Sequence, residues 1–274
     1  MSALPAIFFA DLDATTIYSK RHLSADPDRY TGMTCVETFR EEPQSFMTYR
    51  AVRQLGALSR ELTFVPTTTR DVTQFNRIRL PGVKTTYAIV ANGGRILVDG
   101  IEDPAWTRVV QERLAAVAPL NTILEEITRK LQHETWVKTI SRPADLFACV
   151  NAHAETPAWF VEWADSRAAR WRCRISSQGR KTFIVPFGIS KESAAAEVVR
   201  RTGADVTFAS GDSTLDEGLM KFADYAIHPR HGALNVRAPY FDETVRSGIT
   251  AGEEILTYVS SRLERIVKDR PRAV

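Results

Sequence analysis

The sequence predicts an α/β fold in which a second domain interrupts a parallel sheet. Short apolar runs alternate with helical patterns in the first and last thirds of the chain, an order that is typical of a parallel sheet covered by helices. The five tryptophans all fall in the middle third, which indicates a separate hydrophobic core there. We therefore expect a core domain formed by residues 1–97 and 185–274, with an α+β domain inserted at residues 98–184.

Short apolar runs, each followed by polar residues, predict the strands of the first part of the chain. A helix is expected over Phe46–Leu58, where apolar residues recur at roughly helical spacing. Asp71 can cap a short helix before the third strand. The turn Asn92–Gly94 then leads into a return strand. The four strands are expected at Ala6–Ala10, Leu62–Pro66, Tyr87–Val90 and Arg95–Val98.

Segment 17–44 is too long for an ordinary connection between a strand and a helix. Its polar residues and mixed charges indicate a flap over the end of the first strand. A small hairpin is expected around Thr34–Phe39.

The inserted domain is expected to contain both helices and strands. Its first helix has favourable starting residues, because Asp103 can cap it and Pro104 suits the first helical position. The helices are expected at Asp103–Val117, Leu120–Leu131 and Pro157–Trp171, and the strands at Thr135–Ile140, Leu146–Val150, Arg172–Ser177 and Lys181–Val185.

The α/β order resumes after the insert. Ser190 can cap a helix that runs over Lys191–Arg201. An amphipathic pattern predicts a closing helix over Ala251–Val267. Between them, strands are expected at Ala204–Ala209 and Tyr225–Ile227, with a helix around Leu219–Phe222.

Charge and cysteine content argue against several classes of protein. The 36 Lys and Arg residues are nearly balanced by 33 Asp and Glu, without a long basic run, so we expect no nucleic-acid partner. No apolar stretch reaches the length of a membrane span, so we expect no membrane partner. The widely spaced Cys35, Cys149 and Cys173 favour buried thiols in a reducing cytoplasm over disulfides or a zinc site.

Polar side chains follow three of the expected core strands. On its own, the first such pair could be a polar turn after a strand. However, parallel strands end at one edge of their sheet, where α/β folds bind ligands. Several carboxylates beside a lysine and hydroxyls describe a site for a hard cation such as Mg²⁺, next to a site for phosphate oxygens. These residues are Asp11 and Asp13, Thr67–Thr69, Asp212 and Asp216, with Lys191 at a helix start.

In their order along the chain, these residues resemble the four motifs of the haloacid dehalogenase superfamily. The position of the insert, between the second and third motifs, is similar to the type 2 cap of the Cof-type and sucrose-phosphatase-like branch. The resemblance covers most of the chain and implies a Rossmann-like core with an α+β cap domain. Three positions depart from the family pattern: Ala14 and Thr69 replace glycines, and Leu215 replaces an asparagine. The motifs are Asp11-Leu12-Asp13-Ala14-Thr15, Thr68-Thr69-Arg70, Pro186-Phe187-Gly188-Ile189-Ser190-Lys191 and Gly211-Asp212-Ser213-Thr214-Leu215-Asp216.

The resemblance also implies roles for the motif residues. Asp11 would attack phosphorus and form an aspartyl-phosphate. Asp13 would protonate the leaving oxygen and then accept a proton from the attacking water. Mg²⁺ would be held by the Asp11 carboxylate, the Asp13 backbone carbonyl and Asp212. Thr68 and Lys191 would hold the other phosphoryl oxygens.

Further residues are assigned with alternatives. Asp216 would orient the motif lysine or a metal-bound water. Arg70 either pairs on the surface or touches the substrate, and Arg180 either lies on a solvated turn or grips an anionic or polyhydroxylated leaving group. His231 is either a solvated turn residue or a neighbour of the leaving group. Asn92, in the turn typical of the family, is also a candidate substrate contact.

The resemblance thus implies a Mg²⁺-dependent phosphatase that hydrolyses a small-molecule phosphate ester, such as a sugar phosphate. The cysteine content favours a cytoplasmic location. A phosphomutase of the same architecture is the near alternative. A binding or regulatory protein that has lost turnover is the distant one.

Overall fold

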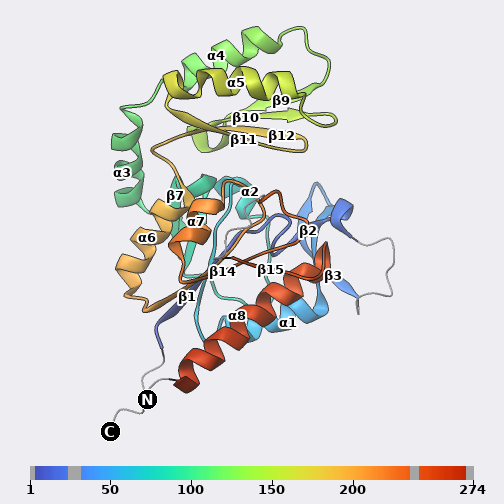
Figure 1. Ribbon diagram of the computed structural model, residues 1–274, viewed down its shortest axis with the longest axis vertical. Coiled ribbons are helices and arrows are strands. Elements are labelled where there is room, and N and C mark those ends of the chain that lie inside the picture. The colour runs from blue at the N-terminus through green and yellow to red at the C-terminus, as the bar shows by residue number, and fades with distance from the viewer. Residues whose placement is uncertain (1–3, 24–31, 235–240, 270–274) are drawn as a thin grey trace.

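The computed structural model describes residues 4–23, 32–234 and 241–269. Its centre is a five-stranded sheet in which every neighbouring pair of strands is parallel (Figure 1). The central strand β1 (Ala6–Ala10) is buried on both faces, as the apolar run predicted. The order across the sheet is β15 (Asp242–Glu243), β14 (Tyr225–His228), β13 (Val206–Ser210), β1 and β5 (Thr63–Pro66).

A smaller antiparallel sheet extends the core beside β5. Strand β6 (Tyr87–Val90) lies next to the end of β5, where Thr67 and Ile89 form a parallel bridge. It pairs with the expected return strand β7 (Arg95–Val98), and β7 pairs with the short β8 (Ile101–Glu102). The expected alternation of strands and helices in the first part of the chain is therefore confirmed, and β8 is an additional strand.

Helices cover both faces of the parallel sheet (Figure 1). Side chains of β1 alternate between the two faces: Ile7 and Phe9 belong to one apolar cluster, and Phe8 belongs to the other. The first face is covered by α3 (Pro104–Leu114), α6 (Lys191–Thr202) and α7 (Glu217–Phe222), and the second by α1 (Tyr49–Leu58) and α8 (Ile249–Asp269).

The strands between β1 and α1 form a third sheet of order β2-β4-β3, which we call the N-terminal sheet. It is made of β2 (Tyr18–Ser19), β3 (Met33–Phe39) and β4 (Glu42–Thr48). The expected hairpin is therefore present. The expected start of the next helix at Phe46 is wrong, because Phe46 pairs with Cys35 within this sheet. The helix begins at Tyr49, where the Thr48 hydroxyl caps it by accepting from the Ala51 N–H at 3.0 Å.

The cap is an antiparallel four-stranded sheet of order β11-β12-β10-β9, with two helices on the face away from the core (Figure 1). It has its own apolar cluster, which includes Val150, Phe160 and Trp171. Trp106, however, packs in the cluster of the core. The boundaries at 98 and 184 stay a prediction. The cap elements are α4 (Leu120–Leu131), β9 (Val137–Ser141), β10 (Ala148–Ala152), α5 (Ala158–Trp171), β11 (Cys173–Gln178) and β12 (Lys181–Pro186).

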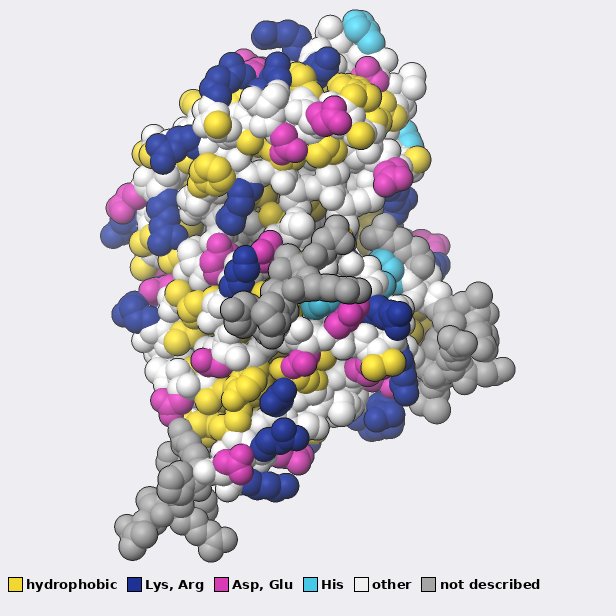
Figure 2. All heavy atoms as spheres, viewed as in Figure 1, with side chains coloured by type: hydrophobic (Ala, Val, Ile, Leu, Met, Phe, Trp, Pro, Cys, Tyr) yellow, Lys and Arg dark blue, Asp and Glu magenta, His cyan; other side chains and the backbone are white. Residues whose placement is uncertain are grey.

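The structure also shows where the cysteines and the charged side chains lie. Cys149 and Cys173 are buried, but Cys35 is exposed, because it lies on the opposite face of β3 from the buried Val36. On the face seen in Figure 2, basic and acidic side chains are interspersed over the core and the cap. Within the described residues, no helix combines the length and the apolar character needed to cross a membrane.

Candidate active site

Asp11 follows directly on β1 and lies beside Lys191. Its N–H continues the sheet by donating to the Ser210 carbonyl at 2.9 Å, and Asp11 is only 5% exposed. Lys191 Nζ donates to Asp11 Oδ1 at 2.6 Å and to Asp216 Oδ1 at 2.5 Å. Because two carboxylates surround it, the pKa of the buried lysine is raised although desolvation opposes this. The lysine therefore stays charged at the end of the central strand.

Three buried carboxylates meet at this edge of the sheet. Oxygen atoms of Asp11, Asp212 and Asp216 lie within 4.8 Å of one another. Burial raises the pKa of Asp11 well above its ordinary value, and burial together with the neighbouring Asp216 raises the pKa of Asp212 to about 7. Such mutual repulsion is what a bound cation relieves, and carboxylate oxygens are the donors that Mg²⁺ prefers.

Asp216 is the member of this group whose oxygens are already engaged. Besides its bond with Lys191, its Oδ2 accepts from the Ser213 N–H at 3.1 Å and from the Ser213 hydroxyl at 2.7 Å. Gly211 permits this close packing, since a Cβ there would lie 2.2 Å from the Asp216 Cβ. Within the described part of the chain, Asp11 Oδ2 and Asp212 Oδ1 accept no hydrogen bond. These two oxygens are therefore the ones available to a cation.

Asp13 turns toward Arg70. Arg70 donates from Nε and from a terminal nitrogen to the two Asp13 oxygens, each at 2.7 Å. Despite partial desolvation, this guanidinium holds the pKa of Asp13 below its ordinary value. The other edge of Arg70 binds Glu37 of β3 at 2.7 and 3.0 Å. Arg70 thus pairs with two carboxylates and joins the N-terminal sheet to the candidate acid–base residue.

Sequence reasoning missed Glu37. It is 4% exposed and also accepts from the Ser45 hydroxyl at 2.6 Å. The available signal was a lone acidic residue next to Val36 in a strand of mixed polarity, which carries no motif. The long insertion after the first strand therefore contributes a buried ion pair to the site.

Ala14 has a left-handed backbone, with φ of 61°. This is the position where the resembled family has glycine, which adopts such a conformation without strain. The Ala14 N–H donates to the Ile17 carbonyl at 2.9 Å, and its carbonyl lies 2.9 Å from His231 Nε2. His231 Nδ1 accepts from the Gly248 N–H at 3.1 Å, so Nε2 carries the proton and donates to Ala14. Burial lowers the pKa of His231, which favours the neutral ring.

The second motif and the turn after β6 pack together behind the site. Thr68 is fully buried, and its hydroxyl accepts from the Arg70 N–H at 3.1 Å. Asn92 is also buried, has a left-handed backbone, and donates its N–H to the Thr68 carbonyl at 2.9 Å. Thr69 lines the cavity in front of the site, whereas Thr68 and Asn92 are not among the lining residues.

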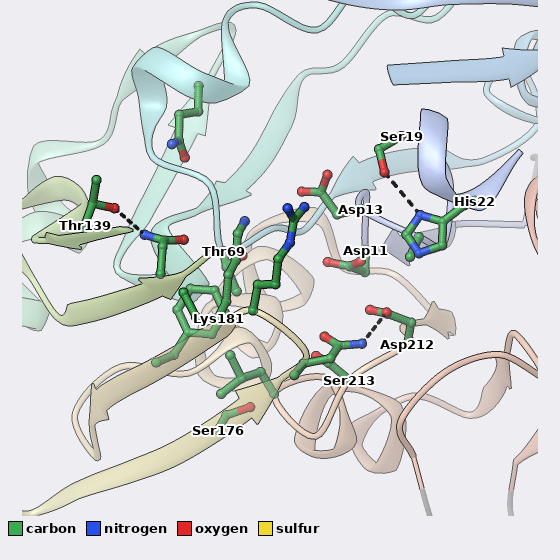
Figure 3. A pocket seen from close by; sticks show the side chains of 18 of the residues that line it. Asp11, Asp13, Ser19, His22, Thr69, Thr139, Ser176, Lys181, Asp212 and Ser213 are labelled. Atoms are coloured by element: carbon green, nitrogen blue, oxygen red, sulfur yellow. Dashed lines mark hydrogen bonds between the residues drawn. The ribbon is translucent and has the colours of Figure 1, made fainter. Parts of the chain in front are cut away.

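A cavity of about 710 Å³ lies between the core and the cap. Figure 3 shows Asp11, Asp13 and Asp212 on the core side, and Thr139, Lys181 and Ser176 on the strands of the cap. The cap also touches the acidic group, because the Gln178 amide donates to Asp212 Oδ2 at 2.8 Å. Of the residues predicted from sequence, the cavity brings together Asp11, Asp13, Lys191, Asp212, Arg180 and His231.

Comparisons with known proteins agree with this architecture. No family model and no curated protein matches the sequence. Among solved structures, the sucrose-phosphatase of Synechocystis, in complex with sucrose and phosphate, aligns at a TM-score of 0.67 and 13% identity. That alignment covers 95% of this chain and 98% of that one.

Two other solved structures of phosphatases also align over most of this chain. The C-terminal domain of trehalose-6-phosphate phosphatase from C. albicans aligns at a TM-score of 0.59 and 13% identity, over 95% of this chain and 94% of that one. A phosphatase of the haloalkanoate (HAD) superfamily from Bacteroides thetaiotaomicron aligns at a TM-score of 0.53 and 13% identity. That alignment covers 96% of this chain and 97% of the other.

The chain therefore has the fold of the capped haloacid dehalogenase (HAD) phosphatases, with a Rossmann-like core and an α+β cap. At the level of fold, the sucrose-phosphatase matches over nearly the whole of both chains.

Proposed function

We propose that this protein is a Mg²⁺-dependent phosphatase that hydrolyses a phosphate monoester of a small metabolite through an aspartyl-phosphate. The observation that carries the proposal is the placement of Asp11. Its carboxylate lies at the end of the central strand, contacts a buried lysine, and faces a cavity covered by the cap. A cavity of about 710 Å³ suits a small molecule better than a macromolecule.

The residues suit the two halves of such a reaction. One oxygen of the Asp11 carboxylate attacks phosphorus and displaces the leaving oxygen, while Lys191 balances negative charge beside the nucleophile. Water then attacks the aspartyl-phosphate and releases phosphate. The Asp11 carboxylate, the Asp13 backbone carbonyl and Asp212 would hold Mg²⁺, which would supply charge neutralisation at the nucleophile and the phosphoryl group. Asp216 orients Lys191 through their hydrogen bond.

Proton transfer is assigned to Asp13. It gives a proton to the leaving oxygen in the first half and accepts one from water in the second. Because Arg70 holds both of its oxygens and keeps its pKa low, one Asp13 oxygen must turn toward the substrate before it can carry a proton. The phosphate contact expected of Thr68 is assigned in this proposal to Thr69, which lines the cavity, whereas Thr68 supports Arg70 from behind.

The remaining assignments follow from the same geometry. Arg180 contacts the leaving group from the cap, and His231 supports the turn after Asp13 through its bond with Ala14. Asn92 supports Thr68 through the backbone. The intact set of acids and lysine favours turnover over a silent binding protein. We expect the substrate to be a cytoplasmic metabolite.

The decisive test is Asp11→Asn in a Mg²⁺-dependent assay with a generic aryl phosphate. The variant should lose at least about a thousandfold in kcat, since removal of a nucleophile costs far more than removal of a binding contact. EDTA should abolish the parent activity, and Mg²⁺ should restore it. Asp165→Asn, which changes an exposed acid on α5, is the matched control and should retain activity.

Hydrolysis by Asp11→Asn at the parent rate would refute the assignment of the nucleophile. Absence of hydrolysis by the parent protein with Mg²⁺ present would refute the phosphatase itself. A requirement for a bisphosphate activator would instead identify a phosphomutase.

A further inference from the structure

We propose that the ester hydrolysed at this site carries a second negative charge on its leaving group, and that Lys138, Arg180 and Lys181 of the cap bind that charge. This inference rests on the proposed phosphatase function and names its class of substrate. The leaving group would be a second phosphate ester or a carboxylate of the same small molecule.

The sheet of the cap directs one polar face into the cavity. Thr139 pairs with Asn151, Asn151 pairs with Lys181, and Lys181 pairs with Gln178, so these four residues form a row across the strands. Directly paired residues point to the same face of a sheet. All four line the cavity, and we call this row the roof. The alternate positions, such as Val150, pack into the cluster under the helices.

An irregularity adds Lys138 to the same face. The pairing of β9 with β10 shifts between Asn151 and Ala152, which pair with Thr139 and Val137 respectively, so that Lys138 is an extra residue. In a regular strand, neighbours point to opposite faces, yet Lys138 and Thr139 both line the cavity. Bulges of this kind redirect a side chain, often beside a binding site. This one adds a positive charge above the reacting groups.

The charged residues of the cap that line the cavity are all basic. Among the described residues, Lys138, Arg180 and Lys181 form no ion pair, although basic residues elsewhere on the cap do: Arg170 pairs with Glu126, and Arg174 pairs with Glu192. No Asp or Glu of the cap lines the cavity. Lysine and arginine side chains only donate hydrogen bonds, so they need acceptors or negative charge. The cap therefore offers mostly donors to whatever lies beneath it.

This composition distinguishes an anionic leaving group from a neutral sugar. Sugar hydroxyls donate as well as accept, so a site for a neutral sugar gains from carboxylates that accept those hydrogen bonds. Among the described residues, the carboxylates that line the cavity are Asp11, Asp13 and Asp212, all on the core side. A phosphate or carboxylate on the leaving group instead matches the three cations of the cap.

The test compares matched pairs of substrates at fixed ionic strength in the presence of Mg²⁺. One pair is fructose 6-phosphate and fructose 1,6-bisphosphate, and the other is glucose 6-phosphate and 6-phosphogluconate. For at least one pair, the substrate with the second negative group should have a kcat/KM at least tenfold higher. The pairs separate the two sources of charge, since one adds a phosphate and the other adds a carboxylate.

Single variants Lys138→Gln, Arg180→Gln and Lys181→Gln should each reduce this preference at least threefold, and added salt should reduce it further. Arg129→Gln is the matched control. It removes one positive charge from the exposed surface of α4, away from the cavity, and should leave the preference unchanged.

In both pairs, equal or better hydrolysis of the substrate with the neutral leaving group would overturn the inference, as would an unchanged preference in all three variants of Lys138, Arg180 and Lys181. Hydrolysis of an aryl phosphate by the parent, with its loss in Asp11→Asn, decides the phosphatase function separately. The substrate class can therefore fail while the function stands.

Discussion

The ion pairs around Arg70 lead to a prediction about stability. Replacement of Glu37 by Gln keeps the size of the side chain but removes the negative charge that faces one edge of the Arg70 guanidinium. In the parent, Arg70 donates two hydrogen bonds to Glu37 and two to Asp13, and its side chain is only 13% exposed. The variant leaves a buried guanidinium with one carboxylate in place of two.

The expected cost follows from burial. Removing one partner of a fully buried ion pair destabilises by about 3–5 kcal/mol. Arg70 retains Asp13, and the glutamine carbonyl can still accept a hydrogen bond, so we expect a smaller loss of about 2–3 kcal/mol. For a chain of this size, each kcal/mol lowers the melting temperature by about 2–4 °C, which predicts a fall of about 4–12 °C.

Thermal unfolding followed by circular dichroism measures this difference. The matched control is Glu42→Gln, which makes the same change of charge at an exposed position on the adjacent β4 and should melt within about 2 °C of the parent. If Glu37→Gln melts at the same temperature as the control, then the contact between β3 and Arg70 contributes little, and the reasoning fails.

Two backbone positions give further predictions. Ala14→Gly should raise the melting temperature by up to about 4 °C, because the left-handed backbone of the alanine costs about 1 kcal/mol of strain that glycine relieves. A lower melting temperature would mean that packing of the buried methyl group outweighs this strain. Gly93→Ala should destabilise and reduce phosphatase activity, since its Cβ would lie 2.0 Å from the Ser190 carbonyl oxygen, next to Lys191. Gly100→Ala is its control, because Gly100 also has positive φ but has open space around it. The Gly93 variant should be at least about 1–3 kcal/mol less stable than the control in urea unfolding, and equal stabilities would refute the clash.

Local patterns were sufficient for the elements that carry the catalytic candidates. Strand β1 is a continuous apolar run that ends at an acid, and Ser190 caps α6, with Lys191 as its first residue. Such features depend on neighbours within a few residues. The error at Phe46 has the same origin, since apolar spacing over a few residues fits either element and the pairing of Phe46 with Cys35 decides between them.

The order of the motifs along the chain was enough to place Asp11, Lys191 and Asp212 at one edge of the sheet, because parallel strands bring their carboxyl ends together. The partners of Arg70 could not be read in the same way. Arg70 meets Glu37 and Asp13 across separations of 33 and 57 residues, and those contacts depend on how the N-terminal sheet packs against the core. The roof likewise depends on register, since a shift of one residue would turn Lys181 away from the cavity. Short-range patterns thus located the candidate catalytic residues, whereas packing between distant segments selected their partners and the charge of the cavity above them.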